Sequence, residues 1–233
     1  MTRKSTCSVV ICAKNEESTI GEILGEVKGL ATEILVVDGA SEDRTSDISL
    51  AMGCRVLQDD GKGKGFALRR GLAEATGNIV VFLDADGSHQ TKDIPLLLAP
   101  ITAGQADLVI ASRVLGGSEE AGGSLYGVLR HSAGVLIAAL INLRFGSRIT
   151  DSQNGFRAID RTVAHSLRLD EDSFTIEQQM TIRCLRHGFR VVEVPSLELR
   201  RMRGTSRLGI MRHGPRFVAC LVRELLLRTG RNA

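Results

Sequence analysis

The segment IVVFLDADGSHQ, residues 79–90, runs from an unbroken apolar stretch into two carboxylates one residue apart, Asp84 and Asp86. A strand that is apolar on both faces is typical of a parallel sheet with helices on both sides. Residues two apart in an extended chain point to the same side, so both carboxylates can face one point beyond the strand. Two close like charges need a counter-charge, and oxygen ligands without a His or Cys cluster favour Mg²⁺ or Mn²⁺ over zinc. A solvated turn is the alternative for an isolated Asp-x-Asp, but the apolar strand before it favours a metal site.

The same alternation of strand and helix signals occupies the rest of the first half of the chain. Short β-rich runs at 8–13, 33–38 and 54–58 alternate with segments of helical period at 17–30, 44–52 and 66–75. This order predicts repeated βαβ units, hence an α/β fold with a mostly parallel central sheet flanked by helices. Ligands bind such sheets at the carboxyl ends of the strands, where Asp38 lies together with the two later aspartates.

The second half of the chain carries weaker signals. A Gly-rich loop at 114–124, long enough to act as a lid, precedes an apolar helix expected at about 127–144. A connector at 149–160, a helix near 174–187, a strand at 189–196 and an amphipathic helix at 215–228 follow. We expect one domain over residues 1–233.

Composition excludes several classes of protein. The chain has 233 residues, 43% apolar and 24% charged, which is enough to bury a sizeable core. A net charge of +3, one Tyr and no Trp argue against a nucleic-acid partner. Five scattered cysteines without a Cys-x-x-Cys pair indicate neither disulfides nor zinc, as expected in a reducing cytoplasm. The most apolar stretch, residues 132–143, is shorter than the roughly 20 residues of a membrane-spanning helix, so we expect no such span.

Two further motifs are basic. The stretch DGKGKGFALRRG, residues 60–71, can bring backbone N–H groups and Lys62 or Lys64 to an anion at a helix start, although a surface turn is the commoner explanation. The stretch ELRRMRGTSRLGIMRHGPR, residues 198–216, is either a solvated basic face or, because arginine dominates, a phosphate-binding segment.

In this order, the motifs resemble those of the family 2 glycosyltransferases, and within them the dolichyl-phosphate mannose synthase type. The resemblance covers nearly the whole chain, and the stretches that carry it are VVICAKNEE (9–17), ILVVDGASEDRT (34–45), GKGKGFALRRGLAEATGNIVVFLDADGSHQ (61–90), VIASR (109–113), DSQNGFRAID (151–160) and RMRGTSRLG (201–209). It implies a nucleotide-diphosphosugar transferase fold, GT-A and Rossmann-like. Residues up to about 113 would bind the nucleotide sugar, and residues from about 114 would form the acceptor side.

The resemblance also implies roles for individual residues on the donor side. Residues that would line the nucleotide and sugar pocket are Ala13, Asn15, Glu16, Asp38, Lys64 and Glu177, with Asp38 on the base or ribose and Glu177 near the sugar. Asp84 and Asp86 would hold Mg²⁺ or Mn²⁺ on the donor diphosphate.

Three arginines and Asp86 would act in the reaction itself. Arg113 would reach the donor phosphates, while Arg201 and Arg207 would grip the acceptor phosphate or the departing diphosphate. A cation held by Asp86 would neutralise the leaving group as the glycosidic bond breaks. We name no catalytic base, because a phosphate acceptor is already ionised at neutral pH.

The expected activity is therefore inverting transfer of a sugar onto a polyprenyl (dolichyl) phosphate at the cytoplasmic membrane face. The favoured donor is GDP-mannose, which would supply mannose, and a UDP-sugar is the other candidate. The alternatives are a glycosyltransferase with a soluble acceptor and a non-catalytic sugar-nucleotide-binding subunit of a membrane complex. Cys12, Lys14, Ser88 and the pair Gln153–Asn154 depart from the usual family motifs and leave the base and sugar open.

Membrane contact is expected to be peripheral, with or without a membrane-protein partner. The amphipathic segments 127–144 and 215–228 can lie in the interface of an anionic membrane, or they can pack on the core or on a second subunit.

Overall fold

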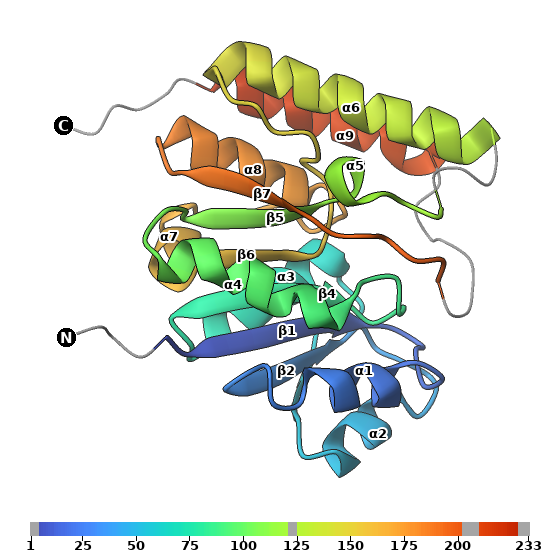
Figure 1. The fold of residues 1–233 in the computed structure, drawn as a ribbon. Helices are drawn as coiled ribbons and strands as arrows, with labels where there is room; N and C mark the ends of the chain where they lie inside the picture. The colour runs from blue at the N-terminus through green and yellow to red at the C-terminus, as the bar shows by residue number, and fades with distance from the viewer. Residues whose placement is uncertain (1–4, 121–124, 202–209, 228–233) are drawn as a thin grey trace.

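A computed structural model describes residues 5–120, 125–201 and 210–227 of the chain, and Figure 1 shows their arrangement around one central sheet. Seven strands follow the spatial order β3-β2-β1-β4-β6-β5-β7. The strands are β1 (Cys7–Ala13), β2 (Glu33–Asp38), β3 (Arg55–Gln58), β4 (Ile79–Asp84), β5 (Leu108–Ser112), β6 (Arg157–Asp160) and β7 (Val191–Pro195). Only β6 runs antiparallel to its neighbours β4 and β5, so the predicted α/β fold with a mostly parallel sheet is confirmed.

The helices alternate with the strands along the chain. They are α1 (Ile20–Val27), α2 (Thr45–Ala51), α3 (Lys64–Glu74), α4 (Ile94–Thr102), α5 (Arg113–Gly116), α6 (Leu125–Phe145), α7 (Arg161–Ser166), α8 (Ile176–Arg186) and α9 (Ile210–Leu226), with a 3₁₀ turn at Thr91–Asp93. The segment expected to be a connector contains β6, and the helix α4 was not expected from the sequence.

Apolar side chains fill both faces of the sheet. Val9 and Ile11 of β1 pack with α1 and α4 on one face, whereas Val10 between them packs with α3 and α8 on the other. This alternation is the two-residue period of a strand covered on both sides. The carboxyl ends of the parallel strands therefore meet at one edge, where the polar residues of the predicted site follow them.

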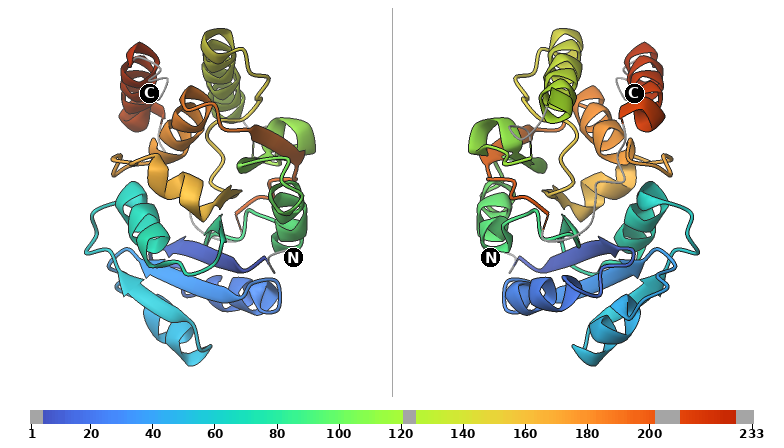
Figure 2. Two further views of the ribbon diagram at one scale, coloured as in Figure 1. Left: turned by 90° about the vertical axis from the view of Figure 1, so that its left-hand side faces the viewer. Right: turned by 90° about the vertical axis from the view of Figure 1, so that its right-hand side faces the viewer.

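Helices α6 and α9 lie side by side on α8, away from the main sheet, as both views in Figure 2 show. Ile137 and Ile141 of α6, Ile182 of α8 and Phe217 and Leu221 of α9 form a third apolar cluster. The outward faces of α6 and α9 are also apolar: exposed residues on them are Val128, Leu129, Val135, Leu136, Leu140, Leu143, Val218, Val222 and Leu226.

Helix α6 is longer than the sequence suggested. By length and composition, its residues Gly127–Phe145 could cross a membrane, whereas the expectation was that the apolar stretch is too short. That expectation counted only residues 132–143, whereas the helix stays apolar enough from Gly127 to Phe145 although it includes Arg130 and Arg144. The core helices of other proteins can have the same length and composition.

Candidate active site

A cavity of about 640 Å³ opens at the carboxyl edge of the sheet. Its wall begins at Cys12 and Ala13, where β1 ends, and passes the aspartates that follow β4. It continues to Val135 of α6 and Phe217 of α9. The cavity thus joins the edge of the parallel sheet to the two outer helices.

Most of the predicted site residues border this cavity. Those in its wall are Ala13, Asn15, Glu16, Lys64, Asp84, Asp86, Arg113, Glu177 and Arg201. Asp38 is buried beside it, and Arg207 lies outside the described residues. The roles proposed for these residues remain predictions, but the structure brings nine of them together around one space.

Lys64 forms the centre of a partly buried group of three ionisable side chains. Its Nζ lies 2.7 and 2.9 Å from the two carboxylate oxygens of Asp84 and 2.8 Å from Oε1 of Glu177. Burial opposes ionisation of Asp84, yet the Lys64 ammonium and a hydrogen bond from His89 hold the pKa of its carboxyl well below the ordinary value. Burial likewise opposes the charge on Lys64, but Asp84 and Glu177 raise the pKa of its ammonium. Asp84 and Lys64 are therefore both charged, and Lys64 is held between the carboxyl groups of Asp84 and Glu177.

Asp86 has a different set of partners. Its Oδ1 accepts hydrogen bonds from the hydroxyl of Ser88 at 2.6 Å and from the Ser88 backbone N–H at 3.0 Å. Its Oδ2 lies 2.9 Å from Nη1 of Arg201, whose Nε lies 3.3 Å from Oε1 of Glu120. A buried carboxylate thus faces a guanidinium across the cavity wall.

These contacts test whether a divalent cation fits. Asp84 already pairs with the ammonium of Lys64, and Asp86 pairs with the guanidinium of Arg201. The two carboxylates therefore form a site that favours positively charged groups. Asp86 is the better ligand, because both oxygens of Asp84 contact Lys64. Carboxylate oxygens suit Mg²⁺ or Mn²⁺. Within the described ranges, no group of three or more His, Cys, Asp and Glu side chains is placed to hold a metal ion, so further ligands would come from water or a bound diphosphate.

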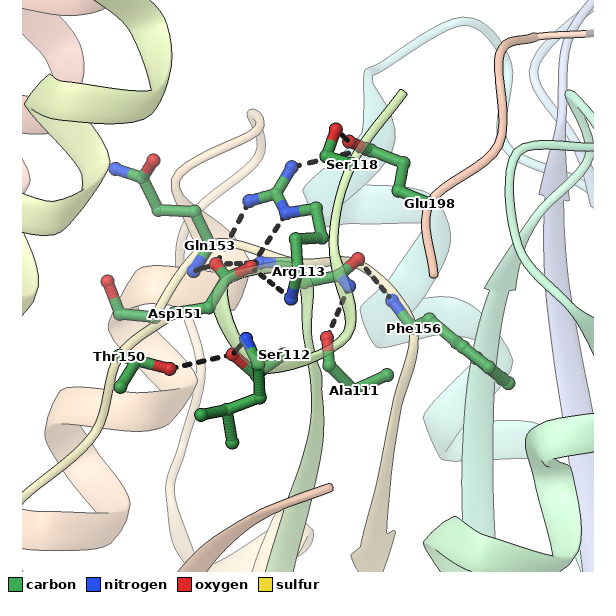
Figure 3. A network of polar contacts seen from close by, with 12 residues as sticks. Ala111, Ser112, Arg113, Ser118, Thr150, Asp151, Gln153, Phe156 and Glu198 are labelled. Carbon is green, nitrogen blue, oxygen red and sulfur yellow. Dashed lines mark hydrogen bonds and ion pairs between the residues drawn. The ribbon is translucent and has the colours of Figure 1, made fainter. Parts of the chain in front are cut away.

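Arg113 lies at the start of α5 between two carboxylates (Figure 3). Its Nε and Nη2 donate to Asp151 at 2.6 and 2.9 Å, and its Nη1 donates to Glu198 at 3.4 Å. Burial raises the pKa of the Asp151 carboxyl, but the Arg113 charge outweighs it and lowers the pKa to about 2. Behind Asp151, Glu193 of β7 accepts hydrogen bonds from the backbone N–H groups of Thr150 and Asp151. Arg113 is thus fixed in position before any ligand binds.

The sequence did not single out the carboxylates around Arg113. Asp151 lies in the quoted stretch DSQNGFRAID, which could have drawn attention to it. Glu193 and Glu198 are more than 75 residues from Arg113 along the chain, and only the pairing of β5 with β7 brings them near.

Asp38 and Asp59 lie at the ends of the neighbouring strands β2 and β3. Asp38 accepts hydrogen bonds from the backbone N–H and hydroxyl of Ser41, so it shapes the loop after β2. Asp59, just beyond β3, borders the cavity and was not singled out. Burial raises the pKa of the Asp59 carboxyl.

The chain is similar to several known proteins. The model of the family "Glycosyl transferase family 2" matches residues 8–167. The chain is 28% identical to a dolichyl-phosphate hexose transferase of Haloferax volcanii, over 86% of each chain. It is 31% identical to an undecaprenyl-phosphate mannosyltransferase of Micrococcus luteus, again over 86% of each.

Some relatives are much longer than this chain. The chain is 32% identical to a dolichol-phosphate mannosyltransferase of Pyrococcus furiosus, with 86% of this chain covering 58% of that one. It spans about half, 47%, of a low-salt glycan biosynthesis hexosyltransferase of Haloferax volcanii.

Among solved structures, the chain is similar to glucosyl-3-phosphoglycerate synthase of Mycobacterium tuberculosis in complex with Mn²⁺, uridine diphosphate and phosphoglyceric acid. The TM-score is 0.76 at 26% identity, over 96% of this chain and 80% of that one.

Proposed function

Because the chain belongs to glycosyl transferase family 2, we propose that it transfers a sugar from a nucleotide-diphosphate donor onto a polyprenyl phosphate, with inversion at the anomeric carbon. The family and the GT-A fold expected from the sequence are confirmed. The observation that carries the proposal is the cavity at the carboxyl edge of the sheet. In its wall the buried carboxylate of Asp86 faces the guanidinium of Arg201, and Arg113, held by Asp151, borders the same cavity. One domain over residues 1–233, with the donor half up to about 113, is part of the same proposal.

The chain's own residues would divide the work in the reaction. A divalent cation held by Asp86 would neutralise the diphosphate leaving group. Lys64 would hold the side chains of Asp84 and Glu177 in position next to the bound sugar. Arg113 and Arg201 would bind phosphate oxygens, for which the guanidinium has a fork of N–H donors. Because the acceptor phosphate arrives ionised, no side chain has to remove a proton from it.

The names of the relatives support a polyprenyl phosphate as the acceptor. Three of them are named for transfer to dolichyl or undecaprenyl phosphate. In this chain the cavity reaches Arg130 and His131 of α6, beside the apolar outer face of that helix. A lipid phosphate could therefore enter the cavity while its chain stays on the apolar side.

The donor base and sugar form the finer part of the proposal. Two relatives are named mannosyltransferases, which supports GDP-mannose. The similar solved structure holds uridine diphosphate, which supports a UDP-sugar. Asp59, which borders the cavity just beyond β3, would accept a hydrogen bond from an N–H of either base.

The second candidate function is transfer to a soluble phosphorylated acceptor. The observation that favours it is the similarity to a synthase crystallised with phosphoglyceric acid and Mn²⁺. The two functions share the donor site and differ in the acceptor.

One experiment separates the candidates. Purified protein is incubated with GDP-mannose, UDP-glucose or UDP-GlcNAc, with Mg²⁺ or Mn²⁺, and with either a short polyprenyl phosphate or 3-phosphoglycerate. Mass spectrometry should find a glycolipid from one donor and no glycosylated phosphoglycerate. Glycosylated phosphoglycerate without glycolipid would establish the soluble acceptor, and no product from any donor would count against both.

We also propose that the protein works as a peripheral protein at the cytoplasmic face of a membrane. The outward faces of α6 and α9 carry exposed apolar side chains, and the basic residues Arg144, Arg216 and Arg223 are exposed on the same two helices. Such helices lie in the interface, and arginines add attraction to anionic lipid.

A further inference from the structure

Arg201 reaches Asp86 from a segment that is fixed to the site. The backbone N–H of Leu199 donates to the carbonyl of Ser88 at 2.9 Å, and that of Glu198 donates to Gly117 at 3.0 Å. The backbone N–H of Arg200 donates to the carboxylate of Glu119 at 3.2 Å. The chain just before Arg201 is thus held against the turn that carries Asp86.

The Arg201 guanidinium lies between two carboxylates. Its Nη1 is 2.9 Å from Oδ2 of Asp86, and its Nε is 3.3 Å from Oε1 of Glu120. The other oxygen of Glu120 is 3.0 Å from Nη2 of Arg130. If Arg201 leaves Asp86, it still has Glu120 as a partner.

The contact with Asp86 involves the oxygen that a metal ion would use. Ser88 donates two hydrogen bonds to Oδ1, which leaves Oδ2 as the oxygen directed at a cation. A Mg²⁺ or Mn²⁺ ion would lie about 2.1 Å from a ligand oxygen. A guanidinium nitrogen already within 2.9 Å of that oxygen occupies the same space and repels a second positive charge.

We infer that Arg201 is an internal counter-ion of Asp86 that a divalent cation must displace, and that the displaced guanidinium becomes available to a phosphate in the cavity. Cation binding at Asp86 and phosphate binding at Arg201 are thereby coupled. The inference rests on the proposed function only for the place of the cation at Asp86.

Binding of Mn²⁺ alone, measured by the loss of the free-ion electron paramagnetic resonance signal, tests the inference without donor or acceptor. Removing the competing guanidinium in R201A should tighten Mn²⁺ binding roughly tenfold, the equivalent of one charge-assisted hydrogen bond. The variant R201Q, which keeps a polar side chain but removes the charge, should also bind Mn²⁺ more tightly than the wild type. The matched control is R200A, which loses the same charge one residue away and should change the affinity less than about twofold.

D86N locates the ion and should lose Mn²⁺ binding. The inference is overturned if R201A and R200A bind Mn²⁺ equally, if R201A binds it more weakly than the wild type, if D86N binds it as the wild type does, or if R201A uncovers no Mn²⁺ site at all. These results are independent of turnover. If R201A binds Mn²⁺ more tightly but the wild-type protein transfers no sugar, the result would count against the proposed function and not against this inference.

Discussion

The backbone of Gly155 lies directly against the carboxylate of Asp84. A Cβ atom added at Gly155 would be 2.7 Å from Oδ2 of Asp84 and 2.9 Å from Nζ of Lys64, closer than such atoms approach each other. The antiparallel pairing of β4 with β6 accounts for this. Phe82 lies opposite Arg157, so Asp84, two residues after Phe82, comes close to Gly155, two residues before Arg157. Only glycine lets the segment before β6 close over the buried ion pair.

Substitution of Gly155 by Ala should therefore damage the site. The added methyl group must push Lys64 or Asp84 aside, which should cost about 1–3 kcal/mol of the free energy of unfolding and lower turnover at least tenfold. Urea unfolding and steady-state kinetics measure the two effects. Gly25→Ala on α1, where a Cβ meets nothing within 4 Å, is the control and should leave turnover unchanged. Wild-type turnover in Gly155→Ala would show that the ion pair is not needed.

Glu224 should make the attachment of α9 sensitive to acid. Its buried side chain bonds Arg183 and Arg186 of α8. Burial raises the pKa of Glu224, but hydrogen bonds from the two arginines lower it from 4.5 to about 2 in the folded protein. Because the folded pKa is depressed, this stabilisation is present above about pH 4.5 and is lost as the pH falls toward 2.

Glu224→Gln should destabilise the protein by about 3–5 kcal/mol at pH 7, because Arg186 loses its charge partner and Arg183 keeps only Asp170. The difference from wild type in urea unfolding should shrink between pH 5 and pH 3. Glu74→Gln, which removes the half-exposed pair with Arg55, should cost less than about 1 kcal/mol. A difference between Glu224→Gln and wild type that stays constant down to pH 3 would refute this account of the acid sensitivity.

The apolar outer face of α6 should carry the protein to membranes. Replacing Leu136 and Leu143 by Glu should abolish flotation with liposomes that contain anionic lipid, because the two side chains are 62% and 85% exposed on that face. Leu50→Glu on α2, at the opposite end of the molecule in Figure 1, should float like the wild type. If the wild type remains in the soluble fraction with anionic liposomes, the membrane proposal fails and the soluble acceptor gains support.

Arg201 and Arg207 are expected to act on the acceptor more than on the donor. Replacing both by Ala should lower the rate of transfer at least a hundredfold while changing the dissociation constant for the donor nucleotide less than about threefold. Calorimetry with GDP and UDP gives the second value. Equal losses in both quantities would assign the two arginines to the donor side.

The sequence predicted the parts of the molecule that local patterns control. Runs of apolar residues ending on Asp identified β2 and β4 and the edge at which a ligand binds. It did not reveal β6, since this strand has four residues and begins with Arg157, a residue type that is mostly exposed. Arg157 is nevertheless fully buried, because its guanidinium donates to the carbonyls of Ser152, Asn154 and Glu177. These hydrogen bonds offset the cost of burying the Arg157 charge, and the bond to Glu177 forms only when residues far apart in the sequence come together. The position of the carboxylates around Arg113 depends on such long-range contacts in the same way.

The most direct test compares sugar transfer to polyprenyl phosphate by the wild type and Asp86→Asn, each titrated with Mn²⁺ and then with excess chelator. The account predicts that wild-type turnover follows bound Mn²⁺ and stops in chelator. It also predicts that Asp86→Asn loses turnover by at least about a hundredfold while its urea unfolding midpoint stays close to that of the wild type. Undiminished turnover in Asp86→Asn, or full wild-type activity in excess chelator, would contradict the claim that Asp86 holds the cation on which the transfer depends.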